Sequence, residues 1–176
     1  MKTSAATNLR WRAPLLFGLL AGALLGGAIG VIAHEKTING SGGADDLEGH
    51  EHRDTINAAG GDDTVLGRQG VDTLNGEGGG DAIGGGQGAD AVSGGLSLDT
   101  INGRDGWDSE LSGDSGNDYV EGDAGKDTMK GGGGSFDRIE AQDGVDGEEV
   151  NGGAGTEDTC VIDLLDSPQG CENFSP

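Results

Sequence analysis

The most regular feature of the chain is a single aliphatic residue that returns at every ninth position among glycine and polar residues. These aliphatic positions are Ile38, Leu47, Ile56, Val65, Leu74, Ile83, Val92 and Ile101. An aspartate lies two residues before each of them except the first, at Asp45, Asp54, Asp63, Asp72, Asp81, Asp90 and Asp99, and Asp108 continues the row. Alternation within each D-x-U-x segment, where U is aliphatic, turns one apolar side chain to one face. The pattern therefore predicts a series of very short strands.

Glycine dominates the other half of each nine-residue unit. The best copies have glycine five and two residues before the aspartate, in the pairs Gly67 and Gly70, Gly76 and Gly79, Gly85 and Gly88, and Gly103 and Gly106. Glycine reaches backbone angles with positive φ at little cost, so G-G-x-G-x-D predicts a turn. Two strand-turn units form an 18-residue coil, and successive coils stack as parallel strands about 4.8 Å apart. We expect an all-β fold in which alternate aspartates line two edges, with Asp54, Asp72, Asp90 and Asp108 on one and Asp45, Asp63, Asp81 and Asp99 on the other.

A different segment precedes the repeats. Lys2, Arg10 and Arg12 lie before an uncharged apolar run over residues 15–33. This order predicts an export signal, although the run is also just long enough to span a bilayer. Residues 1–33 are therefore either a cleaved signal peptide, which we favour, or an uncleaved membrane anchor. We expect a secreted or cell-surface protein, with membrane association only if residues 15–33 are retained.

Charge changes the interpretation of the repeats. The chain has 32 acidic and 10 basic residues, a net charge of −22, and only three Phe, two Trp and one Tyr to fill a core. This acidity argues against nucleic acid as a partner. Stacked carboxylates about 5 Å apart repel each other by roughly 0.8 kcal/mol per pair even in water, so the fold requires cations between its turns. Carboxylate and carbonyl oxygens in flexible turns suit Ca²⁺ better than Mg²⁺ or Zn²⁺.

Three copies of the unit carry a family resemblance. "GGQGADAVS" at 85–93, "GRQGVDTLN" at 67–75 and "GDAGKDTMK" at 122–130 resemble the repeats-in-toxin (RTX, haemolysin-type) calcium-binding nonapeptide. The resemblance extends over about residues 36–160 and implies a parallel β-roll, a right-handed β-solenoid, with several calcium ions between its turns. It implies metal ligation by the four glycine pairs above and by Asp45, Asp63, Asp72, Asp81, Asp90, Asp99, Asp108, Asp118 and Asp127.

Some turns depart from the motif. The turn before Asp54 reads "GHEHRD", the turn before Asp63 contains Ala58 and Ala59, and the turn before Asp99 has Ser97 in place of glycine. We expect these sites to be weak or empty. The next aspartate that follows both glycines of the motif is Asp118, ten residues after Asp108, so the register slips by one residue there. Within a repeat domain over 34–159, we expect a regular part at 36–110 and an irregular part at 111–159.

Two other sets of residues have alternative interpretations. Cys160 and Cys171 are the only cysteines, which favours a disulfide that closes a C-terminal cap over 160–176, rather than a redox or metal-binding thiol pair. By the chain-entropy model such a bridge contributes about 3 kcal/mol. His50 and His52 have the spacing of a zinc pair on a strand, but no third ligand is placed beside them, so a defective turn is preferred.

Catalysis has little support, because no serine lies in a nucleophile elbow and no histidine and carboxylate form a recognisable triad. Three functions remain. The first is an exported calcium-binding module whose roll folds on binding calcium and acts as a surface or matrix component, with a cell-surface polymer or surface protein as partner. The second is a surface-adhesion or ice-binding solenoid, suggested by Thr55 and Thr73 on one side and Thr64 and Thr100 on the other. The third is a non-catalytic remnant of a secreted hydrolase.

Overall fold

Short parallel strands in two sheets make up the fold. The computed structural model describes residues 35–175, so the predicted signal or anchor at 1–33 lies outside the described residues. The first sheet contains β1 (Lys36–Asn39), β3 (Asp54–Asn57), β5 (Thr73–Gly78), β7 (Ala91–Leu96), β9 (Glu110–Ser115), β11 (Thr128–Gly132), β13 (Glu149–Gly153) and β15 (Ser167–Gln169). The second contains β2 (Asp46–Glu48), β4 (Thr64–Gln69), β6 (Ala82–Gln87), β8 (Thr100–Asp105), β10 (Tyr119–Ala124), β12 (Arg138–Ala141), β14 (Thr159–Ile162) and β16 (Asn173–Ser175).

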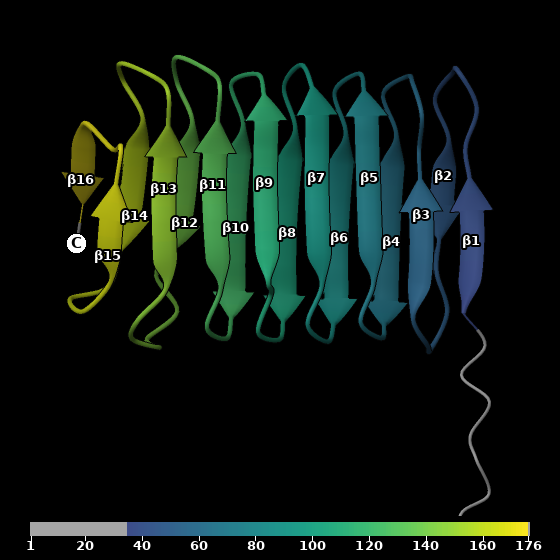
Figure 1. Ribbon diagram of the computed structural model, residues 1–176, viewed down its shortest axis with the longest axis horizontal. Helices are drawn as coiled ribbons and strands as arrows, with labels where there is room; N and C mark the ends of the chain where they lie inside the picture. The colour runs from purple at the N-terminus through teal and green to yellow at the C-terminus, as the bar shows by residue number, and fades with distance from the viewer. Residues whose placement is uncertain (1–34, 176) are drawn as a thin grey trace, which may run out of the picture. The chain divides into compact units, whose positions relative to one another are not determined.

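The chain alternates between the two sheets, so consecutive strands belong to opposite sheets and each strand pairs in parallel with the strand one coil further on (Figure 1). In the first coils the pairing joins residues 18 apart, as in Ile38 with Ile56 and Leu74 with Val92. This register follows directly from two nine-residue units per coil. The predicted parallel β-roll is therefore confirmed.

The core is one row of aliphatic side chains between the two sheets. Its fully or nearly fully buried members are Ile56, Val65, Leu74, Ile83, Val92, Ile101, Leu111, Val120, Met129, Ile139 and Val150. Each such side chain contributes about 1.5–3 kcal/mol when it is buried. Ile38 and Leu47, at the N-terminal end, are only partly buried against this row. The core is thus thin, with about one apolar side chain for each strand.

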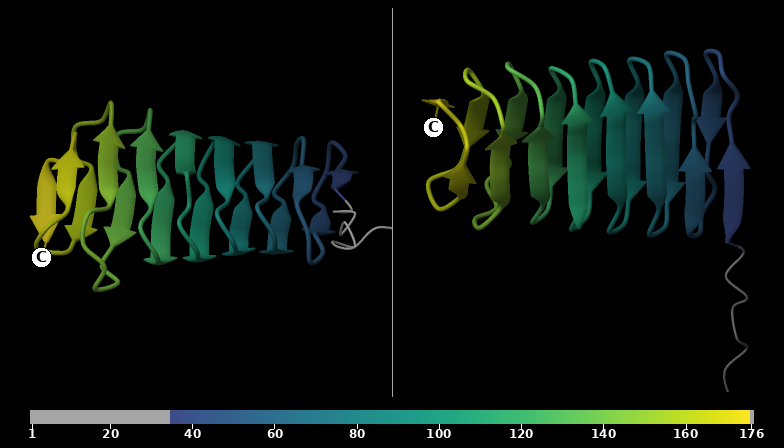
Figure 2. Two further views of the ribbon diagram at one scale, coloured as in Figure 1. Left: turned by 60° about the horizontal axis from the view of Figure 1, so that its bottom comes forward. Right: turned by 45° about the horizontal axis from the view of Figure 1, so that its top comes forward.

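Beyond residue 110 the strands continue in the same two sheets, and the extra residues lie between the ladder positions. Val92 pairs with Leu111, which is 19 residues later, because one residue is added after Asp108. Met129 pairs with Val150, 21 residues later. Most of that addition is in the turn at 142–148, which extends from one edge near the C-terminal end (Figure 2).

The C-terminal end of the core is closed covalently. Cys160 is in β14, paired with Ile139 of β12, and forms the predicted disulfide with Cys171. Both cysteines are buried and belong to the core row. The bridge therefore replaces an aliphatic side chain at the position where the stack of coils ends. Among the described residues, no helix is long and apolar enough to cross a membrane.

Candidate metal centre

Buried acidic side chains line both edges of the roll, in the turns that precede the strands. The lower edge, at the bottom of Figure 1, has Asp54, Asp72, Asp90, Asp108, Asp127 and Glu148, each directly before or at the start of a strand of the first sheet. The upper edge has Asp63, Asp81, Asp99, Asp118, Asp137 and Asp158 before strands of the second sheet. All twelve are at most 3 % exposed. We call these two rows the carboxylate ladders.

One oxygen of nearly every ladder aspartate is held by the preceding coil. The backbone N–H of Asp72 donates to Oδ1 of Asp90 at 2.8 Å, and the N–H of Asp90 donates to Oδ1 of Asp108 at 2.8 Å. The upper edge repeats the arrangement, for example from Asp81 to Asp99 at 2.8 Å. These bonds connect each coil to the next and fix the orientation of each carboxylate.

The second oxygen of each ladder aspartate is buried without a hydrogen-bond partner. This holds for Asp54, Asp63, Asp72, Asp81, Asp90, Asp99, Asp108, Asp118, Asp127, Asp137 and Asp158. A buried polar atom without a partner costs about 1–3 kcal/mol, and more when it is charged. A row of such oxygens requires protons or cations to compensate it.

Burial also raises the pKa of several ladder carboxyl groups. For Asp72, Asp99 and Asp127 the pKa rises to about 6, and for Asp108 and Asp118 it rises to about 7. Desolvation is the largest cause in each case, and the backbone N–H bond acts in the opposite direction. The ladders therefore favour uptake of positive charge near neutral pH.

Glycine leaves open space beside the free oxygens. A Cβ atom added to Gly85 would lie 2.7 Å from the carbonyl oxygen of Gly103, one coil further on, and 2.8 Å from Oδ2 of Asp90. A backbone oxygen and a free carboxylate oxygen therefore border the same small space. Oxygen ligands at about 2.3–2.6 Å are what Ca²⁺ takes in proteins. The residues present thus fit a hard cation, with carbonyl and carboxylate oxygens as ligands.

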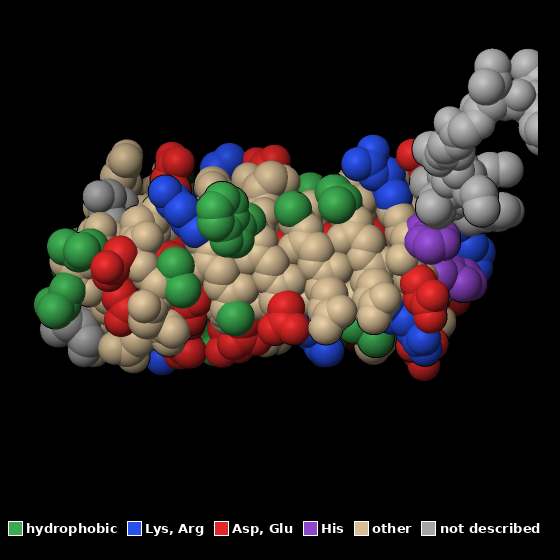
Figure 3. Space-filling model, turned by 90° about the horizontal axis from the view of Figure 1, so that it is seen from below, with side chains coloured by type: hydrophobic (Ala, Val, Ile, Leu, Met, Phe, Trp, Pro, Cys, Tyr) green, Lys and Arg blue, Asp and Glu red, His purple; other side chains and the backbone are tan. Residues whose placement is uncertain are grey.

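Side chains alone do not form a metal site here. In residues 35–175 no group of three or more His, Cys, Asp or Glu side chains lies close enough together to hold a metal ion. A cation between turns therefore needs backbone carbonyl oxygens, as at Gly103. His50 and His52 are exposed at the N-terminal end of the lower edge (Figure 3). The backbone N–H of His50, and not its imidazole ring, donates to Oδ2 of Asp54 at 2.6 Å. The same contact is present one turn earlier, where the backbone N–H of Ser41 donates to Oδ2 of Asp45.

The turns with altered glycines still place their aspartates in the ladders. Asp54, Asp63 and Asp99 are 1 %, 2 % and 0 % exposed, and each keeps one free oxygen. The backbone adapts instead, because Ala59 and Ser97 adopt φ of 80° and 87°. Such left-handed angles are strained for residues other than glycine. How strongly these turns bind a cation stays a prediction.

The other predicted site residues differ in how deeply they are buried. Asp118 and Asp127 lie in the ladders beside the aspartates of the regular repeats, whereas Asp45 is only partly buried. Oδ2 of Asp45 accepts hydrogen bonds from the backbone N–H of Ser41 at 2.6 Å and from its hydroxyl at 2.9 Å. The predicted glycines Gly67, Gly76, Gly85 and Gly103 each lie next to a ladder carboxylate oxygen, and Gly70, Gly79, Gly88 and Gly106 each approach the backbone of the coil before.

Sequence reasoning placed Asp54 on the lower edge in a turn expected to be weak or empty, and did not include Asp137, Glu148 and Asp158 among the site residues. A search for D-x-U alone would have found Asp137, since Ile139 follows it by two residues, and Cys160 takes the same place after Asp158. Glu148 precedes Val150 in the same way, with glutamate in place of aspartate. The change of spacing after Asp108 hid these positions from a fixed nine-residue pattern.

The family model described as RTX calcium-binding nonapeptide repeat matches the chain at residues 37–65, 48–83, 58–92, 84–109 and 110–135, which together cover more than half of the 176 residues. The chain belongs to this family. The predicted resemblance is therefore confirmed, and no curated protein has significant similarity to the chain.

RTX membership explains the ladders but covers only part of the roll. The matched residues include the lower edge as far as Asp127 and the upper edge as far as Asp118. Asp137, Glu148 and Asp158 lie beyond the match, in coils whose turns are longer, and the disulfide lies there as well. The RTX roll of this chain thus continues for further coils whose turns do not follow the nonapeptide.

Proposed function

We propose that the protein is an exported RTX module whose β-roll folds by binding several Ca²⁺ ions between stacked turns and serves as a surface or extracellular structural component. The observation that supports this proposal is the pair of carboxylate ladders, in which each aspartate has one buried oxygen without a partner. Calcium neutralises these oxygens, and its binding free energy becomes folding free energy.

Specific residues would hold the ions. Asp72, Asp90 and Asp108 would supply free carboxylate oxygens along the lower edge, and Asp81, Asp99 and Asp118 would do so along the upper edge. Backbone carbonyls such as that of Gly103 would complete the ligand sets, because the space at Gly85 faces both kinds of oxygen. The ions would thereby join adjacent coils, which the aliphatic core alone holds only weakly.

A calcium titration tests the proposal. Far-ultraviolet circular dichroism of the protein in chelator is followed while Ca²⁺ is raised from micromolar to about 10 mM, the range of weak extracellular sites, with Mg²⁺ as control. A cooperative transition from coil to β-structure with Ca²⁺ and not with Mg²⁺ supports the proposal. A full β spectrum in chelator, or a coil spectrum at 10 mM Ca²⁺, contradicts it.

Export is the second part of the proposal, and it depends on residues 1–33. Expression of the full chain in a host with a secretory pathway should release a product that begins at or near His34. Mass spectrometry of the N-terminal peptide checks this. A product found in the cytoplasm with residues 1–33 intact would contradict export.

One observation favours the adhesion or ice-binding alternative. On the first sheet Thr37, Thr55 and Thr73 lie in register on successive coils, and Asn39, Asn57 and Asn75 form a row of amide hydrogen bonds beside them at 2.9 Å and 2.8 Å. The row ends at the next coil, where Ala91 pairs with Thr73. Thermal hysteresis in calcium buffer would support this alternative, and its absence leaves the structural module.

A further inference from the structure

The lower edge changes its chemistry at its C-terminal end, where the turns at 142–148 and 163–166 lie on adjacent coils. Glu148 occupies the ladder position. The backbone N–H of Glu149 donates to the carbonyl of Asp127 at 3.0 Å, just as the N–H of Ala91 donates to that of Asp72 at 2.9 Å. The longer side chain of glutamate is thus built into a row of aspartates.

Glu148 differs from every aspartate of the ladders in its hydrogen bonding. It is 3 % exposed, and both of its carboxylate oxygens lack a partner, whereas each buried ladder aspartate lacks a partner at one oxygen only. The N–H of Asp127 therefore does not donate to Glu148, and the series of ladder bonds is interrupted there. Both oxygens of Glu148 are available to a ligand.

A second carboxylate faces Glu148 from the next coil. Asp166 is held in place by three backbone donors: the N–H groups of Gly147 at 3.0 Å and Glu148 at 3.2 Å bind Oδ1, and that of Asp163 at 2.8 Å binds Oδ2. The Asp166 carboxylate therefore lies directly beside Glu148, bound to the backbone N–H of that residue. Two adjacent carboxylates repel each other unless a shared proton or a cation lies between them.

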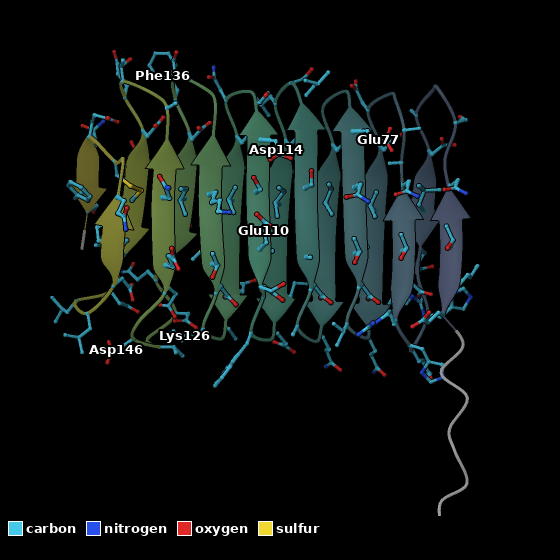
Figure 4. All side chains as sticks on the ribbon, viewed as in Figure 1. Glu77, Glu110, Asp114, Lys126, Phe136 and Asp146 are labelled. Carbon is cyan, nitrogen blue, oxygen red and sulfur yellow. A yellow bond between two sulfur atoms is a disulfide. The ribbon has the colours of Figure 1, made fainter. Side chains whose placement is uncertain are left out.

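Within residues 35–175, the neighbouring side chains do not form an ion pair with Glu148 or Asp166. Asp143 is used by the turn itself, since its oxygens accept from the N–H groups of Val145 at 2.7 Å and Gly125 at 2.9 Å. Lys126 comes from the preceding coil and lies against this turn at the same edge (Figure 4), since a Cβ atom added to Gly147 would lie 3.4 Å from its Nζ. Among the described residues, no ion pair joins Lys126 to Glu148 or Asp166. Glu148 therefore has no direct cationic partner in the described part of the chain.

We propose that Glu148 and Asp166 form a divalent-cation site for Ca²⁺ that differs from the nonapeptide turns, with Glu148 as a two-oxygen ligand. Ca²⁺ readily takes a bidentate glutamate, and the remaining ligands would be backbone oxygens and water. This inference rests on the proposed function, because it takes calcium to be the ion of the roll. The site lies outside the residues matched by the family model and joins the turn at 142–148 to the last coil.

The test compares E148Q with D146N in the full chain. Glutamine has the shape of glutamate, and its amide can donate to Asp166, so the turn keeps a hydrogen bond without the charge. Asp146 is an exposed acid of the same turn, which makes D146N the matched control for loss of one negative charge. Bound calcium per chain is measured by equilibrium dialysis at pH 7.5 with saturating Ca²⁺. We expect E148Q to bind one ion fewer than the wild type and D146N to bind the full number.

Hydrogen exchange of the wild-type protein gives a second readout that needs no variant. Calcium should slow amide exchange in residues 142–149 and 163–166 together with the turns of the regular repeats. An unchanged ion count in E148Q, or no calcium-dependent protection in these two turns while the other turns become protected, would overturn the inference and assign a proton to Glu148. A wild-type protein that binds no calcium at all would instead overturn the proposed function.

Discussion

A single aspartate shows how one residue serves two purposes in this fold. Asp90 accepts the N–H of Asp72 with one oxygen and buries the other without a partner. The first contact is structural and survives loss of the charge, because an amide oxygen accepts the same bond. The second oxygen is the part that needs a cation. The two roles can therefore be separated by replacing the carboxylate with an amide.

The variant D90N should weaken calcium binding without preventing folding. Asparagine keeps an acceptor for the N–H of Asp72 but removes a buried charge, so we expect the calcium concentration at the folding midpoint to rise several-fold. In chelator the same variant should show at least as much β signal as the wild type, since one buried charge is gone. Circular dichroism titrations check both effects, with D46N at an exposed acid as control. Equal midpoints for D90N and wild type would contradict a role of Asp90 in binding.

The raised pKa values predict the effect of pH on the calcium-free roll. Burial raises the pKa of Asp108 and Asp118 from 3.8 to about 7. Between about pH 4 and pH 7 the folded state therefore holds more protons than the unfolded state, and stability falls as pH rises through this window. In chelator we expect more β signal by circular dichroism at pH 5 than at pH 8, whereas at saturating Ca²⁺ the thermal midpoint should be higher at pH 8 than at pH 5. More β signal at pH 8 than at pH 5 in chelator would contradict this prediction.

At the scale of the strand and turn, the limits on side chains come from the neighbouring coil. Gly88 has a φ of 143°, and a Cβ atom added there would collide with the carbonyl oxygen of Gly70 in the preceding coil. Other turn positions tolerate side chains at some cost, since Arg68 and Arg104 adopt φ of 82° and 74°. Both glycines of each motif are thus required for close approach, and a positive φ is a further reason at Gly70, Gly79 and Gly88.

The substitution G88A should therefore disrupt the stack locally. The added methyl group meets backbone atoms of another coil, which cannot move without breaking the ladder, so we expect a loss of at least about 2 kcal/mol in calcium-bound stability. G42A is the matched control, because a Cβ atom there meets nothing within 4 Å. Urea unfolding at saturating Ca²⁺ measures the difference. Similar curves for the two variants would argue against the tight approach of neighbouring coils.

Much of the fold could be predicted from the sequence because one short unit repeats. Period nine gave the strands, the two sheets and the alternation of edges, from Ile38 to Ile101. The coils after Asp108 were harder, since an added residue moves the aliphatic position to Leu111 and hides the ladder from a fixed spacing. Glu148 was missed because its role depends on burial and on Asp166, which no local pattern shows. Turn length is set by contacts between coils, and those become visible only in three dimensions.

At the scale of the whole molecule, each coil contacts its neighbours and few others. Stability in such a stack is approximately a sum of local contributions, and the ends are its weakest parts. The two ends of this roll differ. At the N-terminal end Ile38 and Leu47 are only partly covered, whereas the C-terminal end is closed by the Cys160–Cys171 bridge.

Removal of the bridge should loosen the C-terminal coils and leave the others unchanged. For the double variant C160S/C171S we expect a loss of about 3 kcal/mol in the stability of the terminal coils, following the chain-entropy model. Hydrogen exchange at saturating Ca²⁺ should become faster in residues 150–175 and stay the same in residues 54–75. A uniform increase along the chain would show that the roll unfolds as a single cooperative unit.

The ladder hydrogen bonds all run in one direction, from the N–H of one coil to the carboxylate of the next coil toward the C-terminus. The last of them runs from Asp158 to Glu172 at 2.9 Å. A coil therefore has acceptors for these N–H groups only after the following coil has been made. If the chain leaves the cell N-terminus first, each coil that emerges gains acceptors for these N–H groups as soon as the coil after it has followed. The ladders of a prematurely terminated chain would therefore end in N–H groups without these acceptors.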